Sequence, residues 1–97
     1  MSSNTTIITC AVTGSSLSPS MSPHLPWRPE DIVAQSVGAA KAGAAVLHLH
    51  ARDQTTGKPS NTLEDWRATV PAIRDQCDAI INMSASRGQT AEERLSA

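Results

Sequence analysis

Hydrophobic residues recur along the first half of the chain in patterns that predict a strand, a helix and a second strand. Residues 6–12 are β-branched and mostly apolar, as is typical of a buried strand. Residues 29–43 place apolar side chains at helical spacing, start with a proline and two acidic residues, and end in glycine, as helices commonly do. Residues 44–50 follow as the second strand.

The second half of the chain repeats this order. Residues 53–59 are rich in turn formers, and residues 63–77 have helical spacing with Pro71 as an expected kink. Residues 80–84 form a third strand, and Thr90 is an N-cap that begins a third helix. The fold class predicted is α/β, with parallel strands joined by right-handed crossovers.

Two histidines at the end of the second predicted strand are the main candidates for chemistry. Strand side chains alternate between faces, so His48 and His50 point to one side and Leu47 and Leu49 to the other. Two neutral imidazoles placed in this way can bind one transition metal, although the spacing alone is more often structural.

Other polar residues follow the first and third strands. Ligands of parallel α/β sheets lie at the carboxyl ends of the strands, so Thr13, Gly14 and Ser84 are expected near the histidines. Thr13 and Gly14 offer a hydroxyl and a backbone amide to a carboxylate, or form a plain turn. Ser84 has no His/Asp partner at a recognisable spacing, which argues for a hydrogen bond to substrate or to the loop rather than nucleophilic attack.

Composition narrows the class of protein. The chain has no Phe or Tyr and a net charge of −1, without a basic run, which argues against nucleic-acid binding. No apolar stretch reaches the roughly 18 residues of a membrane span and no signal peptide is recognisable, so we expect a cytoplasmic location. Cys10 and Cys77 are then expected as free thiols.

The sequence also resembles a known family, the β-keto acid cleavage enzymes, which include 3-keto-5-aminohexanoate cleavage enzyme. The resemblance runs from about Thr6 to Leu95, and its most specific part is Gly-Ala-Ala-Val-Leu-His-Leu-His-Ala-Arg-Asp at residues 43–53. The sequence is also similar to this family at residues 8–14, 21–26 and 57–60.

The resemblance implies a zinc-dependent (β/α)8 TIM barrel of about three times this length. Residues 1–97 would then be its first three strands, an incomplete segment with no second domain and no activity alone. In the family, histidines at the positions of His48 and His50 bind zinc with a Glu expected beyond Ala97, and a serine matching Ser84 lies in the active site. The implied enzyme is a homo-oligomer that exchanges acyl groups between a β-keto acid and acetyl-CoA, giving acetoacetate and a new acyl-CoA.

Two positions depart from the family pattern. Ser16 stands where the aminohexanoate enzyme has a Glu that receives the substrate ammonium, so an amino-bearing substrate is disfavoured and Ser16 is a substrate-binding candidate. Arg87 replaces a glycine of the loop after the third strand and adds positive charge there.

Two other functions are compatible with the histidine pair. The first is a metal-dependent hydrolase of the amidohydrolase type, which also uses His-x-His, but normally on the first strand. The second is not an activity at all: the chain would be a truncated product without function. Three nearby residues have plainer expected roles: His24 in loop packing or substrate contact, Asp53 in capping the turn before Gly57, and Arg52 in a structural pair with a carboxylate.

Overall fold

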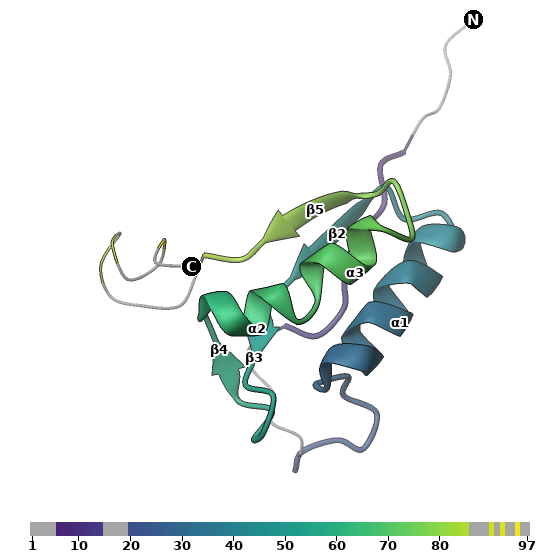
Figure 1. Ribbon diagram of the computed structural model, residues 1–97. Coiled ribbons are helices and arrows are strands. Elements are labelled where there is room, and N and C mark those ends of the chain that lie inside the picture. Colours follow the sequence, from purple (N-terminus) through teal and green to yellow (C-terminus); the bar gives the residue numbers. More distant parts are fainter. Residues whose placement is uncertain (1–5, 15–19, 86–89, 91, 93–94, 96–97) are drawn as a thin grey trace, which may run out of the picture.

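The computed structural model describes residues 6–14, 20–85, 90, 92 and 95. These residues form a mixed α/β structure with a parallel sheet and helices packed beside it (Figure 1). The sheet has the order β1-β2-β5, with β1 at Thr9–Ala11, β2 at Val46–Leu49 and β5 at Ile80–Met83. The helices are α1 (Pro29–Lys41), α2 (Leu63–Arg67) and α3 (Val70–Arg74). The predicted α/β class with parallel strands is therefore confirmed.

The two faces of the sheet differ in what covers them. Leu47 and Leu49 of β2 are 0% and 1% exposed and belong to the core, together with Trp66 of α2 and Ile73 of α3. Val33 and Ala39 of α1 pack against the same cluster. All three helices therefore contact the face that carries the leucines, and β2 presents its histidine on the opposite face.

The first helix follows the prediction closely. α1 begins at Pro29, has Glu30 and Asp31 in its first turn, and is capped at Ala42. The next residue, Gly43, has φ of +120°, a backbone conformation that favours glycine. The glycine therefore ends the helix and turns the chain into β2.

The first strand is shorter than predicted. Residues 6–12 were expected to be extended throughout, but β1 comprises only Thr9–Ala11 and pairs with β2 alone among the described strands. Ile7 and Ile8 are 72% and 55% exposed, although the Ile8 carbonyl still accepts from the amides of Ala45 and Val46. Hydrophobic sequence marks this segment as strand-like, but pairing partners decide its length.

The predicted helix over residues 63–77 is wrong, because the structure divides it into α2 and α3. In a continuous helix, Pro71 would lack the N–H that bonds the carbonyl of Arg67 and would clash with it. α2 ends at that Arg67, and Thr69 leaves helical geometry with φ of −123°. Pro71 then lies in the first turn of α3, where a missing N–H costs little.

A small antiparallel ribbon directly follows the histidines and was not predicted. β3 (Ala51–Arg52) pairs with β4 (Pro59–Ser60), and the predicted loop over residues 53–59 joins them. The Asp53 carboxylate accepts hydrogen bonds from the amides of Thr55 and Thr56, both at 2.8 Å. The expected capping role of Asp53 is thus confirmed.

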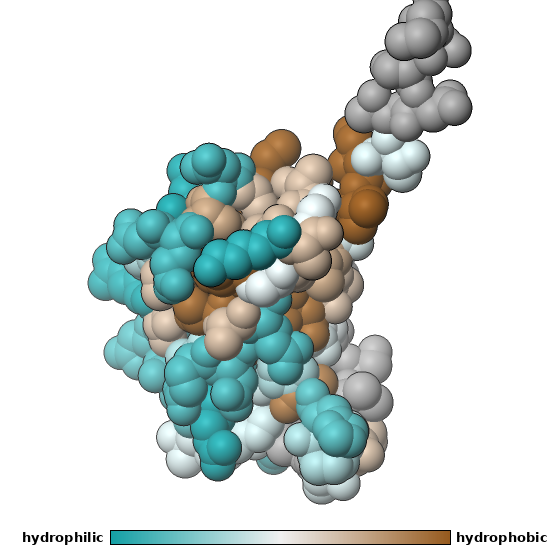
Figure 2. Space-filling model, turned by 90° about the vertical axis from the view of Figure 1, so that its right-hand side faces the viewer, coloured by the Kyte–Doolittle hydropathy of each residue, from teal (hydrophilic) through white to brown (hydrophobic). Residues whose placement is uncertain are grey.

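Cys10 and Cys77 are free thiols, as predicted. No helix in the described part of the chain is long and apolar enough to cross a membrane. Figure 2, which views the side where α1 lies in Figure 1, shows hydrophobic surface among polar residues. Most of the helix predicted from Thr90 lies outside the described residues.

Candidate metal-binding site

His48 and His50 lie side by side at the carboxyl end of β2. His48 is in the strand, His50 directly follows it, and both side chains are half-buried. Their ring centroids are 5.0 Å apart, and the ring planes meet edge-to-face at 84°. The arrangement expected from strand alternation is therefore present, with two imidazoles on the side of the sheet away from the leucines.

Asn82 of β5 holds the first of these imidazoles. The sheet register places Asn82 directly beside His48, and the side-chain oxygen Oδ1 of Asn82 lies 2.6 Å from Nδ1 of His48. A carbonyl oxygen accepts hydrogen bonds and does not donate them, so Nδ1 carries the proton. The neutral ring then keeps its lone pair on Nε2, the form in which imidazole binds metals.

Electrostatics favour a neutral ring at His50. Burial lowers the pKa of His50 below its ordinary value, and the neighbouring His48 and Arg52 lower it further. Because a protonated imidazole has no lone pair to donate, this shift keeps His50 available as a metal ligand near neutral pH.

Arg52 connects this region to the end of β1. Its side chain is 2% exposed and donates from Nη1 to the Gly57 carbonyl at 2.8 Å and from Nη2 to the Gly14 carbonyl at 3.0 Å. Both of these hydrogen bonds go to main-chain oxygens. The guanidinium thus ties the β3–β4 turn to the loop that follows β1.

Three other candidate residues, Ser84, Thr13 and Gly14, lie at the same end of the sheet. The amide of Ser84 donates to the Leu49 carbonyl at 2.8 Å, which continues the β2–β5 pairing beyond β5. Thr13 is buried, and its hydroxyl donates to the Pro26 carbonyl at 2.7 Å. Gly14 follows with φ of +68°. Ser16 and Arg87 lie outside the described residues.

The described residues supply part of a metal site. Among them, no group of three or more His, Cys, Asp or Glu side chains could hold a metal ion. Neither His24 nor Asp53 therefore joins the histidine pair. His48 and His50 fit two positions of a tetrahedral zinc sphere, whose catalytic form has three protein ligands and an open position.

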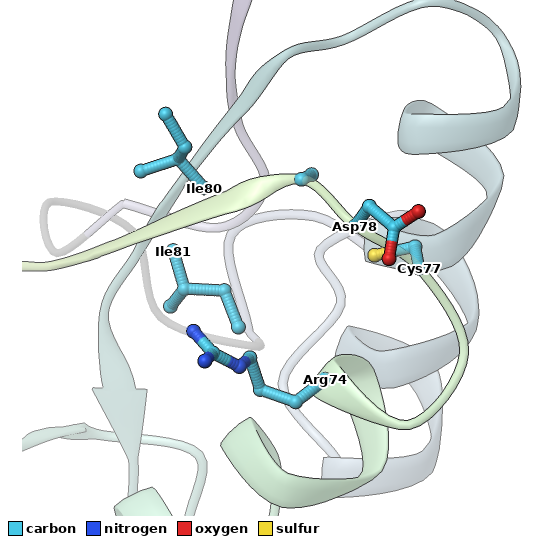
Figure 3. A pocket seen from close by; sticks show the side chains of 6 residues that line it. Arg74, Cys77, Asp78, Ile80 and Ile81 are labelled. Carbon is cyan, nitrogen blue, oxygen red and sulfur yellow. The ribbon is translucent and has the colours of Figure 1, made fainter.

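A pocket of about 420 Å³ lies away from the histidines. Its lining comes from the end of α3, the connection to β5 and the first residues of that strand (Figure 3). The residues are Arg74, Cys77, Asp78, Ala79, Ile80 and Ile81. Because it lies at the amino end of β5, and Ser84 follows the carboxyl end, this pocket is not part of the candidate site.

Comparison with known proteins decides the family. The profile of the beta-keto acid cleavage enzymes matches residues 5–97. The chain belongs to this family. Membership disfavours the hydrolase alternative, as does the position of the histidines on β2 rather than on the first strand.

Curated relatives from three bacteria cover most of this chain. The 3,5-dioxohexanoate:acetyl-CoA acetone transferase of Paraburkholderia graminis is 46% identical, over 92% of this chain and 29% of its own length. The 3-dehydrocarnitine:acetyl-CoA trimethylamine transferase of Rhizobium meliloti is 44% identical, over 84% and 27%. The 3-keto-5-aminohexanoate cleavage enzyme of Acetoanaerobium sticklandii is 40% identical, over 92% and 33%. The chain thus spans about a third or less of the relatives' length.

Sequence reasoning missed Asn82 entirely. Alternation along residues 80–84 puts Ile80, Asn82 and Ser84 on one face, which was readable in advance. The register that brings Asn82 beside His48 is a tertiary feature, and nothing local in the sequence specifies it.

Proposed function

We propose that this chain supplies the first β-α-β-α-β segment of a (β/α)8 barrel that exchanges acyl groups between a β-keto acid and acetyl-CoA. The observation that carries the proposal is the family match over residues 5–97, joined to a histidine pair at the carboxyl end of a parallel strand. The names of two relatives include acetyl-CoA, and a third is a keto acid cleavage enzyme.

The arrangement of the sheet supports a barrel segment. Strand order follows chain order, and the helices pack on one face, as in a singly wound sheet. A doubly wound sheet would carry helices on both faces and reverse its strand order. The open face, which carries His48, corresponds to the barrel interior.

In the proposed reaction, the bond between the α and β carbons of the β-keto acid breaks and the acyl part is transferred to CoA. The acetyl group of acetyl-CoA joins the released carboxymethyl part, giving acetoacetate. The reaction balances, because one CoA thioester is consumed and another is formed.

We further propose that the complete enzyme is a homo-oligomer located in the cytoplasm.

Zinc is the cofactor we propose for this site, held by His48, His50 and a Glu from outside this chain. When bound, zinc would polarise the β-keto oxygen as a Lewis acid. His48 would contribute Nε2, because its Nδ1 is hydrogen-bonded to Asn82. The lowered pKa of His50 favours its neutral form, in which one ring nitrogen has a free lone pair.

Of the remaining candidates, Ser84, Gly14 and Ser16 are assigned to the substrate and Thr13 to the loop. Ser84, at the end of β5, is proposed to hydrogen-bond the keto acid and is the catalytic candidate of this segment. The Thr13 hydroxyl has one proton and donates it to Pro26, so it orders the loop. A substrate carboxylate would then be bound by loop amides near Gly14 and by Ser16.

The activity can be tested in a completed barrel. We would fuse this chain to the segment that follows the matched region in the Paraburkholderia relative, then supply zinc, acetyl-CoA and a panel of β-keto acids. We expect acetoacetate from the fusion and none from the 97-residue chain alone. His48→Ala and His50→Ala should abolish zinc retention and activity, whereas His24→Ala should retain zinc and is the matched control for metal binding. A folded fusion that makes no acetoacetate from any acid contradicts the proposal, and amide hydrolysis would instead support the hydrolase.

A further inference from the structure

We propose that Asn82 is a positioning residue for His48. Its side-chain oxygen keeps the proton of His48 on Nδ1, so that Nε2 is the nitrogen that binds a metal. The proposal rests on the function proposed above only for the identity of the metal. The hydrogen bond itself belongs to the metal-free chain.

The contact arises from the pairing of β2 with β5. In the parallel register, His48 is opposite Asn82, and both side chains lie on the face that the helices leave open. Oδ1 of Asn82 and Nδ1 of His48 are 2.6 Å apart, a short distance for a hydrogen bond. A neutral imidazole has a single proton, and this bond places it on Nδ1.

Such a bond restricts the ligand in two ways. It selects one tautomer, and it restricts rotation of the ring about the Cβ–Cγ bond. Without Asn82, the ring would exchange between tautomers, and only one of them offers the lone pair on Nε2. Losing a partner of this kind typically weakens metal binding by about 10- to 100-fold.

The chemistry of the acceptor makes the proposal specific. An amide oxygen is neutral, whereas many metal-binding histidines donate to a carboxylate. Asn82→Asp retains an acceptor at the same position and adds negative charge. Asn82→Ala removes the acceptor. Ile80→Ala is the matched control, because Ile80 lies on the same strand and face, is 66% exposed, and is paired with Val46 rather than His48.

The first experiment identifies the protonated nitrogen of His48. Long-range ¹H–¹⁵N spectra of the labelled, metal-free chain at about pH 8 distinguish the two tautomers when both rings are neutral. We expect the Nδ1–H form in the native chain, in Asn82→Asp and in Ile80→Ala, and a mixture of tautomers in Asn82→Ala. The signals of His50 in the same spectra serve as an internal reference.

The second experiment titrates the same four proteins with Zn²⁺ and follows both imidazoles. Asn82→Ala should bind about 10- to 100-fold more weakly than the native chain, and Asn82→Asp at least as tightly as it. A native His48 protonated at Nε2, or an Asn82→Ala variant with native tautomer and zinc affinity, would overturn the proposal. If the native tautomer is Nδ1–H but zinc shifts neither imidazole, the zinc site of the proposed function fails and the positioning of His48 by Asn82 stands.

Discussion

Replacing Arg52 with methionine tests whether the arginine of the His-Leu-His-Ala-Arg-Asp motif is structural. Methionine keeps most of the buried aliphatic length but removes the guanidinium. The change breaks the hydrogen bonds to Gly57 and Gly14, which join the β3–β4 turn to the loop after β1. It should therefore loosen two loops that flank the candidate site.

The magnitude follows from those two bonds. Each hydrogen bond from a charged donor contributes about 1.5–3 kcal/mol, so their sum is at most about 6 kcal/mol. Removing a buried charge also relieves a desolvation cost, and water can reach the half-buried Gly14 in place of the guanidinium. The Gly57 carbonyl is buried and loses a donor. We therefore expect a net loss of about 2–4 kcal/mol in the free energy of unfolding.

Urea unfolding followed by tryptophan fluorescence measures this loss, because Trp66 belongs to the core. A complete domain has roughly 5–15 kcal/mol in total, so Arg52→Met, introduced into the fusion with the rest of the barrel, should lower the urea midpoint strongly. Arg52→Lys keeps the charge but not the two-pronged geometry, so its stability should lie between those of the native protein and Arg52→Met. Arg67→Met changes an exposed arginine and should cost no more than about 0.5 kcal/mol. Equal stability of Arg52→Met and Arg67→Met would refute the structural role.

Two further predictions concern the same fold. Thr62→Ala removes the hydroxyl that caps α2 by accepting a hydrogen bond from the Asp65 amide, and should lower the free energy of unfolding by about 1 kcal/mol. Urea unfolding measures this loss. Thr55→Ala, in the exposed turn, is the control and should cost less than Thr62→Ala. For pH, the lowered pKa of His50 means that the unfolded chain binds more protons, so stability should be full above about 6.5 and fall as the pH drops through the folded pKa. The lowered pKa of Asp53, caused mainly by its bonds to Thr56 and Thr55, adds a second loss below 3.8. A urea midpoint that stays constant from pH 8 to pH 5, or that His50→Gln leaves equally pH-dependent, would contradict the first of these effects.

Local signals in the sequence were sufficient for several elements. Pro29 and Gly43 marked the limits of α1 because each restricts or frees the backbone at its own position. Alternation predicted that His48 and His50 share a face, since strand geometry alone determines it. Asp53 could be predicted as a turn residue because its side chain bonds amides only two and three residues ahead.

What could not be predicted depends on contacts between distant segments. The end of β1 is set by its pairing with β2, and hydrophobic residues such as Ile8 carry no information on where that pairing stops. Arg52 bonds Gly14, which lies 38 residues away, and no local feature of the sequence indicates a partner at that distance. Pro71 did signal a disruption, but helical spacing on both sides of it disguised two helices as one.

The hydrogen bond between His48 and Asn82 also has a consequence for the order of events during synthesis. The two residues are 34 positions apart, and the ribosome adds residues from the N-terminus at about 5–20 per second. The histidine pair therefore leaves the ribosome roughly 2–7 seconds before its partner. During that interval the Asn82 side chain is not yet available to hold the His48 ring. Arrival of β5 converts a flexible pair of imidazoles into an oriented one.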